Sequence, residues 1–404
     1  MKSLSSFRSV ARACRPGILA AALALLMGGA MAQTAAPKIG EPMEKLTDGH
    51  VLGPATPHRL YVMDAAFNHL VDSRIQIYDG DTLKFLGLVP TSFNGHMTVS
   101  ADGREIYVMT TYYERLNRGK RIDLIEIWDA ISLTPKHEIV IPSKRAQALN
   151  YRNYLRQSSD GGLLFIQNAT PAASVSVVDL KARKFTDEIT ATAGCWSVIV
   201  LPSRPRSFTT VCGNGSLLTV DMDAQGRPAS QQRSKRMFDV AKDPVFIHTE
   251  HLGDKFYFVS FNGNVYSADF SGKEVAFEAP WALQQKGDEG KGWRPGGYNL
   301  MAVNRANRRL YVGMHTNGRE GSHKTPAEEI WVYDLDSKQR VARIPGGAAL
   351  SMSVSQDPQP RLFTIDGGNV SVYDAAPVAP VLLGKIENAG ETALQLEPQP
   401  WSTK

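Results

Sequence analysis

Histidine side chains are the groups in this chain whose spacing could bind a metal ion. His248 and His251 lie three residues apart in VFIHTEHLG, a segment that reads as a strand running into a turn. Side chains three residues apart on a strand point to opposite faces, so these two rings are not expected to share a metal ion. His315 and His323 belong to a polar loop beside Lys324, where we expect loop or interface hydrogen bonding.

Motifs for catalysis provide no further candidates. The sequence contains no G-x-S-x-G, no H-E-x-x-H and no G-x-x-x-x-G-K-[ST], the patterns of a nucleophile elbow, a zinc protease and a phosphate-binding loop. His69 and His96 are single residues without an evident acid–base partner. We therefore expect neither catalytic residues nor a metal site on this chain.

The first 32 residues have the pattern of a secretory signal peptide. Four basic residues precede an apolar run at 17–29 (GILAAALALLMGG), and Ala30-Met31-Ala32 follows it, as at a signal-peptidase site. The run is short for a permanent membrane anchor, which needs about 20 residues and is the alternative. Cleavage after Ala32 would leave 41 basic against 40 acidic side chains. The signal peptide predicts a periplasmic protein. The charge balance indicates neither nucleic acid nor membrane as a partner.

Export also bears on the cysteines. Cys14 lies in the predicted signal peptide, which leaves Cys195 and Cys212 in an oxidising compartment. The intervening WSVIVLPSRPRSFTTV reads as two β-segments around a turn centred near Ser203 and Arg204. A hairpin folded at this turn places the two cysteines opposite each other and predicts a disulfide. Two free thiols or metal ligands are the alternative.

A short β-type pattern ending in aspartate occurs seven times. The strings are IQIYD, IEIWD, VSVVD, LLTVD, VYSAD, IWVYD and VSVYD, and they end at Asp79, Asp129, Asp179, Asp221, Asp269, Asp334 and Asp374. Recurrence in every unit favours a turn-forming role for this aspartate. A ring of metal ligands is the alternative.

Each repeat predicts four strands. A second apolar segment precedes the aspartate strand, as LYVMD does at 60–64, and a third candidate stands upstream of most, as in MTVSADGRE at 97–105. A fourth follows, as in LKFLGLVP. Four strands per 40–50 residues are typical of a propeller blade. We predict an all-β fold, a seven-bladed β-propeller of four-stranded blades, as one domain over 33–404 with an N-terminal arm at 33–58. A series of β-sandwiches is the alternative.

Three long polar segments are candidates for contact with a partner or ligand. They are interpreted as loops at 110–124, 281–300 and 314–329, and propeller insertions of this kind commonly carry function.

Longer strings resemble a known family. YVMDAAFNHLVDSRIQIYD (61–79), AGCWSVIVLPSRPRSFTTVCGNGSLLTVD (193–221) and HKTPAEEIWVYDLDSKQRVARIPGGAALSM (323–352) are similar to the heavy subunit of quinoprotein amine dehydrogenases. The FNGH, CWSV and ADFSG strings resemble aromatic amine dehydrogenase more than methylamine dehydrogenase. The likeness covers essentially all of the chain after the signal peptide.

The resemblance implies a subunit that supports catalysis without performing it. In this family two heavy propellers assemble with two light subunits as an α2β2 heterotetramer, and the light subunit carries the tryptophan tryptophylquinone cofactor and the catalytic base. The assembly deaminates primary amines oxidatively to aldehyde and ammonia. It passes electrons to a periplasmic cupredoxin of the azurin or amicyanin type.

One residue role follows from the resemblance. The segment MDAAFNHL matches the place where the family has a phenylalanine at the mouth of the substrate channel, and that position is Phe67 here. An aromatic wall would place an arylalkylamine through contacts of about 1 kcal/mol. The alternative for Phe67 is simple packing under a loop.

Two other function classes stay open on the sequence. One is a lactonase-type propeller hydrolase with a metal in its central channel, and the other is a periplasmic binding propeller that uses the long loops. The neighbouring reading frame would discriminate, because a small Cys-rich exported protein favours the amine dehydrogenase.

Overall fold

The computed structural model describes residues 51–401. These residues belong to one compact unit that spans 45–404. The predicted signal peptide at 1–32 lies outside the described residues, and so does most of the predicted arm at 33–58. No described segment forms a helix with the length and apolar character needed to cross a membrane.

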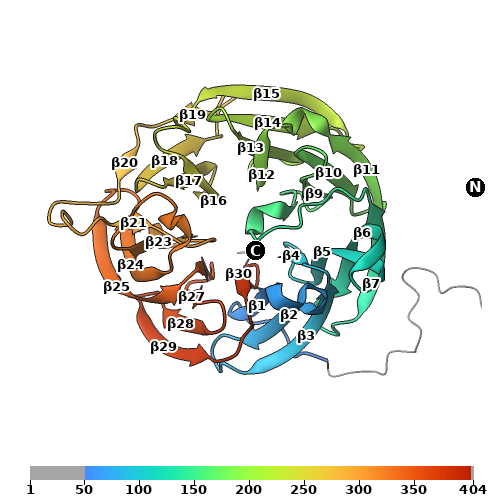
Figure 1. Cartoon of the computed structure of the whole chain (residues 1–404), viewed down its shortest axis with the longest axis horizontal. Helices are drawn as coiled ribbons and strands as arrows, with labels where there is room; N and C mark the ends of the chain where they lie inside the picture. The colour runs from blue at the N-terminus through green and yellow to red at the C-terminus, as the bar shows by residue number, and fades with distance from the viewer. Residues whose placement is uncertain (1–50, 402–404) are drawn as a thin grey trace, which may run out of the picture. The chain divides into compact units, whose positions relative to one another are not determined.

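Seven β-sheets stand around a central axis as the blades of a propeller (Figure 1). The predicted fold class is therefore confirmed. In each blade the strands are given from the axis outward. The first three blades are β4 (His96–Val99), β5 (Glu105–Arg115), β6 (Arg118–Asp129) and β7 (Pro135–Ile141); then β8 (Leu155–Gln157), β9 (Leu163–Asn168), β10 (Ser174–Asp179) and β11 (Lys184–Ile189); then β12 (Cys195–Val200), β13 (Ser207–Cys212), β14 (Ser216–Met222) and β15 (Pro228–Arg236). The other four are β16 (Val245–Leu252), β17 (Lys255–Ser260), β18 (Asn264–Asp269) and β19 (Ala276–Phe277), with β20 (Trp281–Ala282) on β18; β22 (Met301–Asn304), β23 (Arg309–His315), β24 (Ala327–Asp334) and β25 (Arg340–Ala349), with β21 (Arg294–Pro295) on β23; β26 (Ser351–Val354), β27 (Arg361–Ile365), β28 (Val370–Asp374) and β29 (Val381–Ile386); and the closing blade β30 (Ala393–Pro398), β1 (Arg59–Asp64), β2 (Ser73–Asp79) and β3 (Phe85–Ser92).

The last of these blades closes the ring with both ends of the described chain. β30 is its innermost strand and pairs with β1 in antiparallel register, Leu60 opposite Pro398 and Asp64 opposite Ala393. The repeat count did not assign this strand, although the alternation in ALQLEP is a strand signal.

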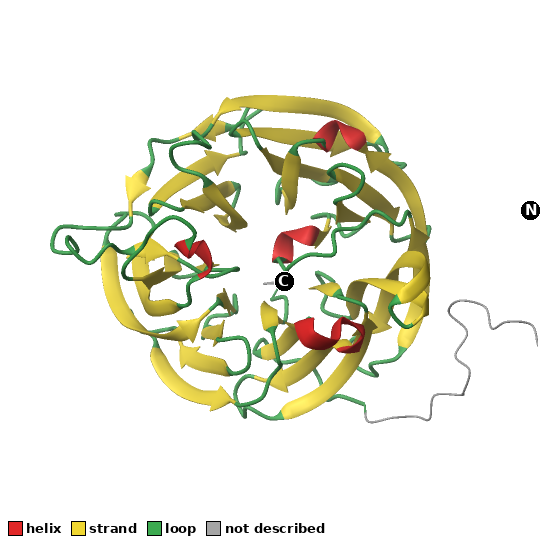
Figure 2. Cartoon of the chain, in the orientation of Figure 1, coloured by secondary structure: helices red, strands yellow, loops and turns green. Residues whose placement is uncertain are grey.

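Antiparallel pairing sends the connections alternately to two faces of the propeller. One side of the propeller carries the connections that lead into each innermost strand and those that join the second and third strands of each blade. We call this side the loop face. The turn face carries the remaining connections. Four 3-10 helices occur among residues 51–401, and all lie in loop-face connections (Figure 2): η1 (Phe67–Asp72), η2 (Arg152–Tyr154), η3 (Thr190–Thr192) and η4 (Ser322–Lys324).

Alternation along the strands builds the core between blades. In β1, Leu60 packs in the apolar cluster that contains Phe363, whereas its neighbour Tyr61 packs in the cluster that contains Met97. One strand thus binds the blades on both of its sides, because successive side chains point to opposite faces of the sheet. Burial of each such side chain contributes about 1.5–3 kcal/mol.

The recurrent aspartates cap the turns of the turn face. The Oδ1 atom of Asp79 accepts the backbone N–H of Thr82 at 2.8 Å, and Asp129 accepts that of Ser132 at 2.9 Å. Four others make the same kind of contact: Asp179, Asp269, Asp334 and Asp374. The predicted turn role is confirmed for these six positions.

Asp221 departs from this pattern. Its carboxylate accepts hydrogen bonds from Arg204, Ser207 and Ser230. Asp223, two residues on, caps the following turn through the backbone N–H of Gln225 at 2.8 Å.

The polar segment at 110–124 is not a loop, so that interpretation was wrong. β5 and β6 run through it as one long hairpin that turns at Leu116 and Asn117. Cross-strand pairing explains the difference, because Thr111 lies opposite Asp123 and the two side chains hydrogen-bond at 2.7 Å. The segment 281–300 does consist mostly of irregular connections, whereas 314–329 includes the end of β23, the helix η4 and the start of β24 around its irregular parts.

The cysteines lie where the hairpin argument predicts them. Cys195 begins β12, Cys212 ends β13, and the two are paired in register and joined by a disulfide. Both are buried, and their end of the hairpin belongs to the loop face.

Candidate functional site

The loop face carries an aromatic cluster beside the channel axis. Tyr151 lies 5.5 Å from Tyr154 and 6.2 Å from Tyr298 between ring centroids. Trp196 donates its Nε1–H to the Tyr154 hydroxyl at 3.0 Å, and the His96 ring lies 5.4 Å from the Tyr154 ring. Tyr154 and His96 are buried, whereas Tyr151, Trp196 and Tyr298 are partly exposed. The cluster therefore presents rigid aromatic surface on this face.

Phe67 also lies on the loop face, where it begins η1. Its backbone N–H donates to Thr392 Oγ1 at 2.9 Å, and its ring is partly buried. The preceding Ala66 has φ 45°, a conformation that is strained for a non-glycine residue. Asp64 holds this turn by accepting the N–H groups of Ala66 and Thr392, each at 3.0 Å. Two connections of the closing blade thus position Phe67 jointly.

The predicted histidines do not converge. His248 is buried and its Nε2 lies 3.2 Å from Glu250 Oε1, whereas His251 bonds the Gly253 carbonyl through Nδ1 at 2.9 Å. His315 is buried and contacts the Thr316 carbonyl at 2.8 Å. Within residues 51–401, no group of three or more His, Cys, Asp or Glu side chains has an arrangement able to hold a metal ion.

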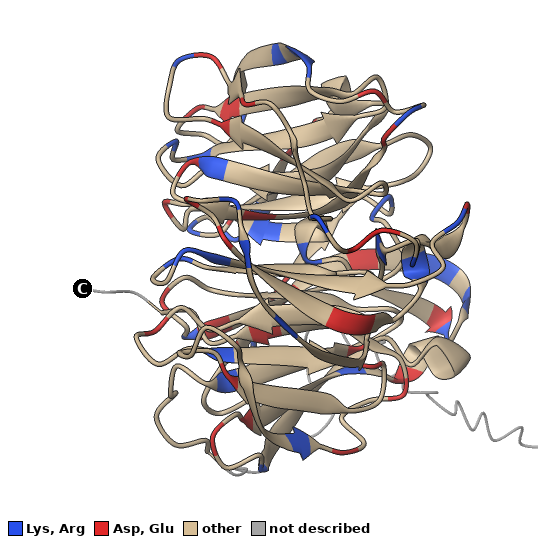
Figure 3. Cartoon of the chain, turned by 90° about the vertical axis from the view of Figure 1, so that its left-hand side faces the viewer, with Lys and Arg blue, Asp and Glu red and all other residues tan. Residues whose placement is uncertain are grey.

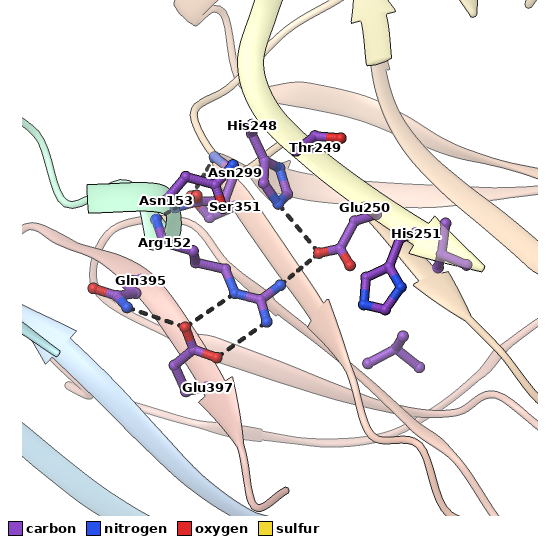
Figure 4. A network of polar contacts seen from close by, with 12 residues as sticks. Arg152, Asn153, His248, Thr249, Glu250, His251, Asn299, Ser351, Gln395 and Glu397 are labelled. Carbon is purple, nitrogen blue, oxygen red and sulfur yellow. Dashed lines mark hydrogen bonds and ion pairs between the residues drawn. The ribbon is translucent and has the colours of Figure 1, made fainter. Parts of the chain in front are cut away.

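A cluster of ion pairs joins the innermost strands β16 and β30 to the 3-10 helix η2 (Figure 4). Arg152 donates through Nε and Nη2 to the two oxygens of Glu397 at 3.1 and 3.0 Å, and through Nη1 to Glu250 Oε1 at 2.5 Å. Arg156 and Gln395 donate to Glu397 Oε1, each at 3.1 Å. A bidentate guanidinium–carboxylate contact of this kind is among the strongest polar contacts in proteins.

Both carboxylates of the cluster are ionised near neutral pH. Burial alone would raise the pKa of Glu250, but Arg152 and His248 outweigh it and lower this pKa to about 2. Burial alone would also raise the pKa of Glu397, but the positive charges of Arg152 and Arg156 outweigh this effect and lower the pKa. The negative charges that Arg152 requires are therefore present near neutral pH.

Asn299 ties the cluster to the loop face. Its Nδ2 donates to the carbonyls of Asn150 at 3.1 Å and Leu394 at 2.7 Å, and its Oδ1 accepts the N–H of Arg152 at 3.3 Å. Segments of three blades therefore meet at one buried amide. The sequence analysis missed this cluster, although Glu250 and Glu397 are charged residues within apolar innermost strands, which is a usable signal.

Charge is otherwise spread evenly. Basic and acidic residues are interspersed along the side of the propeller (Figure 3).

Comparison with known proteins gives one family. The model of the methylamine dehydrogenase heavy chain family matches residues 56–396. The methylamine dehydrogenase heavy chain of Methylobacillus flagellatus is 26% identical over 340 residues, 83% of this chain and 84% of that protein. The corresponding chain of Methylophilus methylotrophus is 26% identical over 381 residues, 93% of this chain and 92% of that protein.

Solved structures share the fold at lower identity. A putative 6-phosphogluconolactonase from Bacteroides fragilis has a TM-score of 0.59 at 11% identity, covering 85% of this chain and 99% of that chain. Kuenenia stuttgartiensis hydrazine synthase has a TM-score of 0.54 at 16% identity, covering 83% of this chain and 99% of that chain. At these identities the likeness shows the propeller fold alone.

Proposed function

The chain belongs to the methylamine dehydrogenase heavy chain family, and we propose that it is the heavy, cofactor-free subunit of a periplasmic quinoprotein dehydrogenase for aromatic amines. The observation that carries the proposal is the family match over 56–396, which spans all seven blades. The enzyme would deaminate primary arylalkylamines to aldehyde and ammonia and pass the electrons to a cupredoxin. Its light subunits would pair with two heavy chains.

The loop face is the surface that suits a light subunit. Partly exposed Tyr151, Trp196 and Tyr298 supply large aromatic contact area at a small cost in side-chain entropy, and tyrosine and tryptophan are enriched at protein interfaces. Lys324 adds a positive charge 6.0 Å from the Tyr298 ring. The long connections at 283–300 and 316–326 border this face.

The packing of one tryptophan pair on this chain supports our placing the tryptophylquinone on the light subunit. Trp293 and Trp331 are the pair whose rings pack together, 5.0 Å apart between centroids. Both are buried in an apolar cluster, and the guanidinium group of Arg343 lies 5.1 Å from the Trp293 ring. An amine could not reach either ring, so we assign the cofactor and the catalytic base to the light subunit.

This chain's own contribution would be to shape the substrate entrance. The fixed backbone of Phe67, held by Thr392 and Asp64, would present its ring to an incoming arylalkylamine. Edge or face contact between two aromatic rings contributes about 0.5–1.5 kcal/mol. The same contact is absent for methylamine, so Phe67 would favour aromatic substrates.

The test is the visible spectrum of the assembled protein. The protein is purified from its native host together with whatever subunit it assembles with there. We expect a coloured complex that phenylethylamine or tyramine bleaches and that an azurin-type cupredoxin reoxidises. A colourless protein without amine-dependent bleaching would overturn the proposal, and bleaching by methylamine alone would overturn its aromatic part.

A further inference from the structure

A cavity opens where the central channel reaches the turn face. Its volume is ≈ 460 Å³, and its wall takes residues from the innermost strands of all seven blades or the turns that follow them. Pro398, the last residue of β30, and the following residues Gln399 to Trp401 are part of this wall. Because Pro398 pairs with Leu60 and Ala393 with Asp64, the cavity and Phe67 lie at opposite ends of the channel. We call this cavity the turn-face pocket.

Positive groups outnumber negative groups in the turn-face pocket. Its wall contains the guanidinium groups of Arg152, Arg156 and Arg305 but only the carboxylates of Glu250 and Glu397. His251 is the remaining titratable side chain in the wall. Burial, followed by the charge of Arg305, lowers the pKa of His251, so its ring is neutral at pH 7.

Arg152 contacts both carboxylates, and one positive charge of the wall remains in excess, because three guanidinium groups face two carboxylates. Within residues 51–401, Arg156 has one acceptor, Glu397 Oε1 at 3.1 Å, and that oxygen already accepts a hydrogen bond from Arg152. Among the same residues, Arg305 has no carboxylate partner. It donates through Nε to Gln356 Oε1 at 3.2 Å and contacts His251 Nε2 at 3.3 Å, and both acceptors are neutral.

The electrostatic environment agrees with this geometry. Burial, together with the nearby positive charge of Arg152, lowers the pKa of Arg156, although Glu397 opposes the shift. Arg305 is exposed at the mouth of the pocket, and its partial loss of water together with the charge of Arg152 lowers its pKa against Glu250. An added anion stabilises a cation that lacks a full counter-charge, and this effect is greater for the partly buried Arg156 than for the exposed Arg305.

We propose that the turn-face pocket binds a small molecule through an oxyanion group, a carboxylate or a phosphate, held by Arg156 and Arg305. Guanidinium groups suit this chemistry, because their planar set of donors matches both kinds of oxyanion. The volume is within the range of small-molecule sites. Glu250 and Glu397 do not exclude such a ligand, because their two negative charges face three guanidinium groups and the wall keeps one positive charge in excess. This site goes beyond the proposed amine oxidation and does not depend on it.

Calorimetric titration of the assembled protein tests the site. Inorganic phosphate and succinate are titrated separately at constant ionic strength, which distinguishes the two head groups. We expect saturable binding of at least one probe with one site per propeller chain. Arg305→Gln should weaken it about tenfold, and Arg305→Lys should restore part of the affinity because the charge remains.

A matched control lies three residues along the chain. Arg308 is exposed and donates to both oxygens of Asp336 outside the pocket wall, so Arg308→Gln should bind the probes as the unchanged protein does. Absence of saturable binding by both probes in the millimolar range would overturn the proposal. Equal affinities for Arg305→Gln and Arg308→Gln would also overturn it, because the binding would then be independent of the pocket.

Discussion

The two faces of the propeller are built differently from the same repeated unit. On the turn face, connections such as 80–84 and 130–134 are short, and an aspartate carboxylate caps them through backbone N–H groups. On the loop face, connections such as 142–154 and 316–326 are long and carry all four described 3-10 helices. The first set repeats, so it serves the architecture, whereas the second varies from blade to blade and can carry recognition.

The difference also concerns the chemistry at the two ends of the channel. Aromatic rings, those of Tyr151 and Tyr298 among them, gather at the loop-face end, while unequal numbers of guanidinium and carboxylate groups line the turn-face end. Arg152 separates the two environments. An aromatic surface suits a protein partner, and an undercompensated cationic pocket suits a small anion.

Of the substitutions considered, removal of the Arg152 side chain is expected to lower the stability of the channel most. Arg152→Ala deletes three hydrogen bonds and leaves the mostly buried carboxylates of Glu250 and Glu397 with less compensation. Breaking a buried ion pair in this way costs about 3–5 kcal/mol. The free energy of unfolding, measured with urea, should fall by that amount.

A surface ion pair supplies the control for Arg152→Ala. Arg308 is exposed and contacts Asp336 on the turn face, so Arg308→Ala should leave the free energy of unfolding unchanged within error. Equal effects of the two substitutions would show that the central cluster contributes no more than a solvated pair.

The sequence predicts the repeated strands and turns of the blades far better than it predicts the contacts that vary from blade to blade. Seven aspartate-ending strands predict blade number and turn chemistry, because every repeat carries the same local signal. In the cluster, Arg152 contacts Glu250 and Glu397, which lie 98 and 245 positions away in the sequence, and no local pattern announces such contacts. The hairpin at 110–124 was missed for a related reason, since its polar side chains are satisfied across strands.

The disulfide tests how the loop face is held. Cys195 and Cys212 are 17 residues apart, and a loop of this size corresponds to about 3 kcal/mol of stabilisation. Cys195→Ala combined with Cys212→Ala should lower the free energy of unfolding by about this amount. Dithiothreitol should destabilise the unchanged protein and leave the double variant as it was. A double variant as stable as the unchanged protein would contradict a stabilising role for this link.

The central cluster should lose stability in acid and keep it at neutral pH. The pKa of Glu250 is lowered from 4.5 to about 2 in the folded chain, so its stabilisation is complete above pH 4.5 and is lost as the pH falls toward 2. The loss from this group should reach about 2 kcal/mol by pH 3, and the lowered pKa of Glu397 acts in the same direction. Urea unfolding at pH 6 and pH 3 measures it. Glu250→Gln should reduce the acid dependence, and an unchanged dependence would contradict the assignment.

The smallest expected effect belongs to Phe67 and concerns selectivity rather than stability. If its ring forms part of the substrate entrance, Phe67→Ala loses about 1 kcal/mol of contact with an aromatic amine and none with methylamine. The ratio of kcat/KM for phenylethylamine to that for methylamine should then fall about fivefold. Phe93 is a matched control, because it is also partly buried on the loop face and packs 5.2 Å from Tyr113. Phe93→Ala should leave this ratio unchanged. If Phe67→Ala also leaves the ratio unchanged, Phe67 is a packing residue and the light subunit determines specificity.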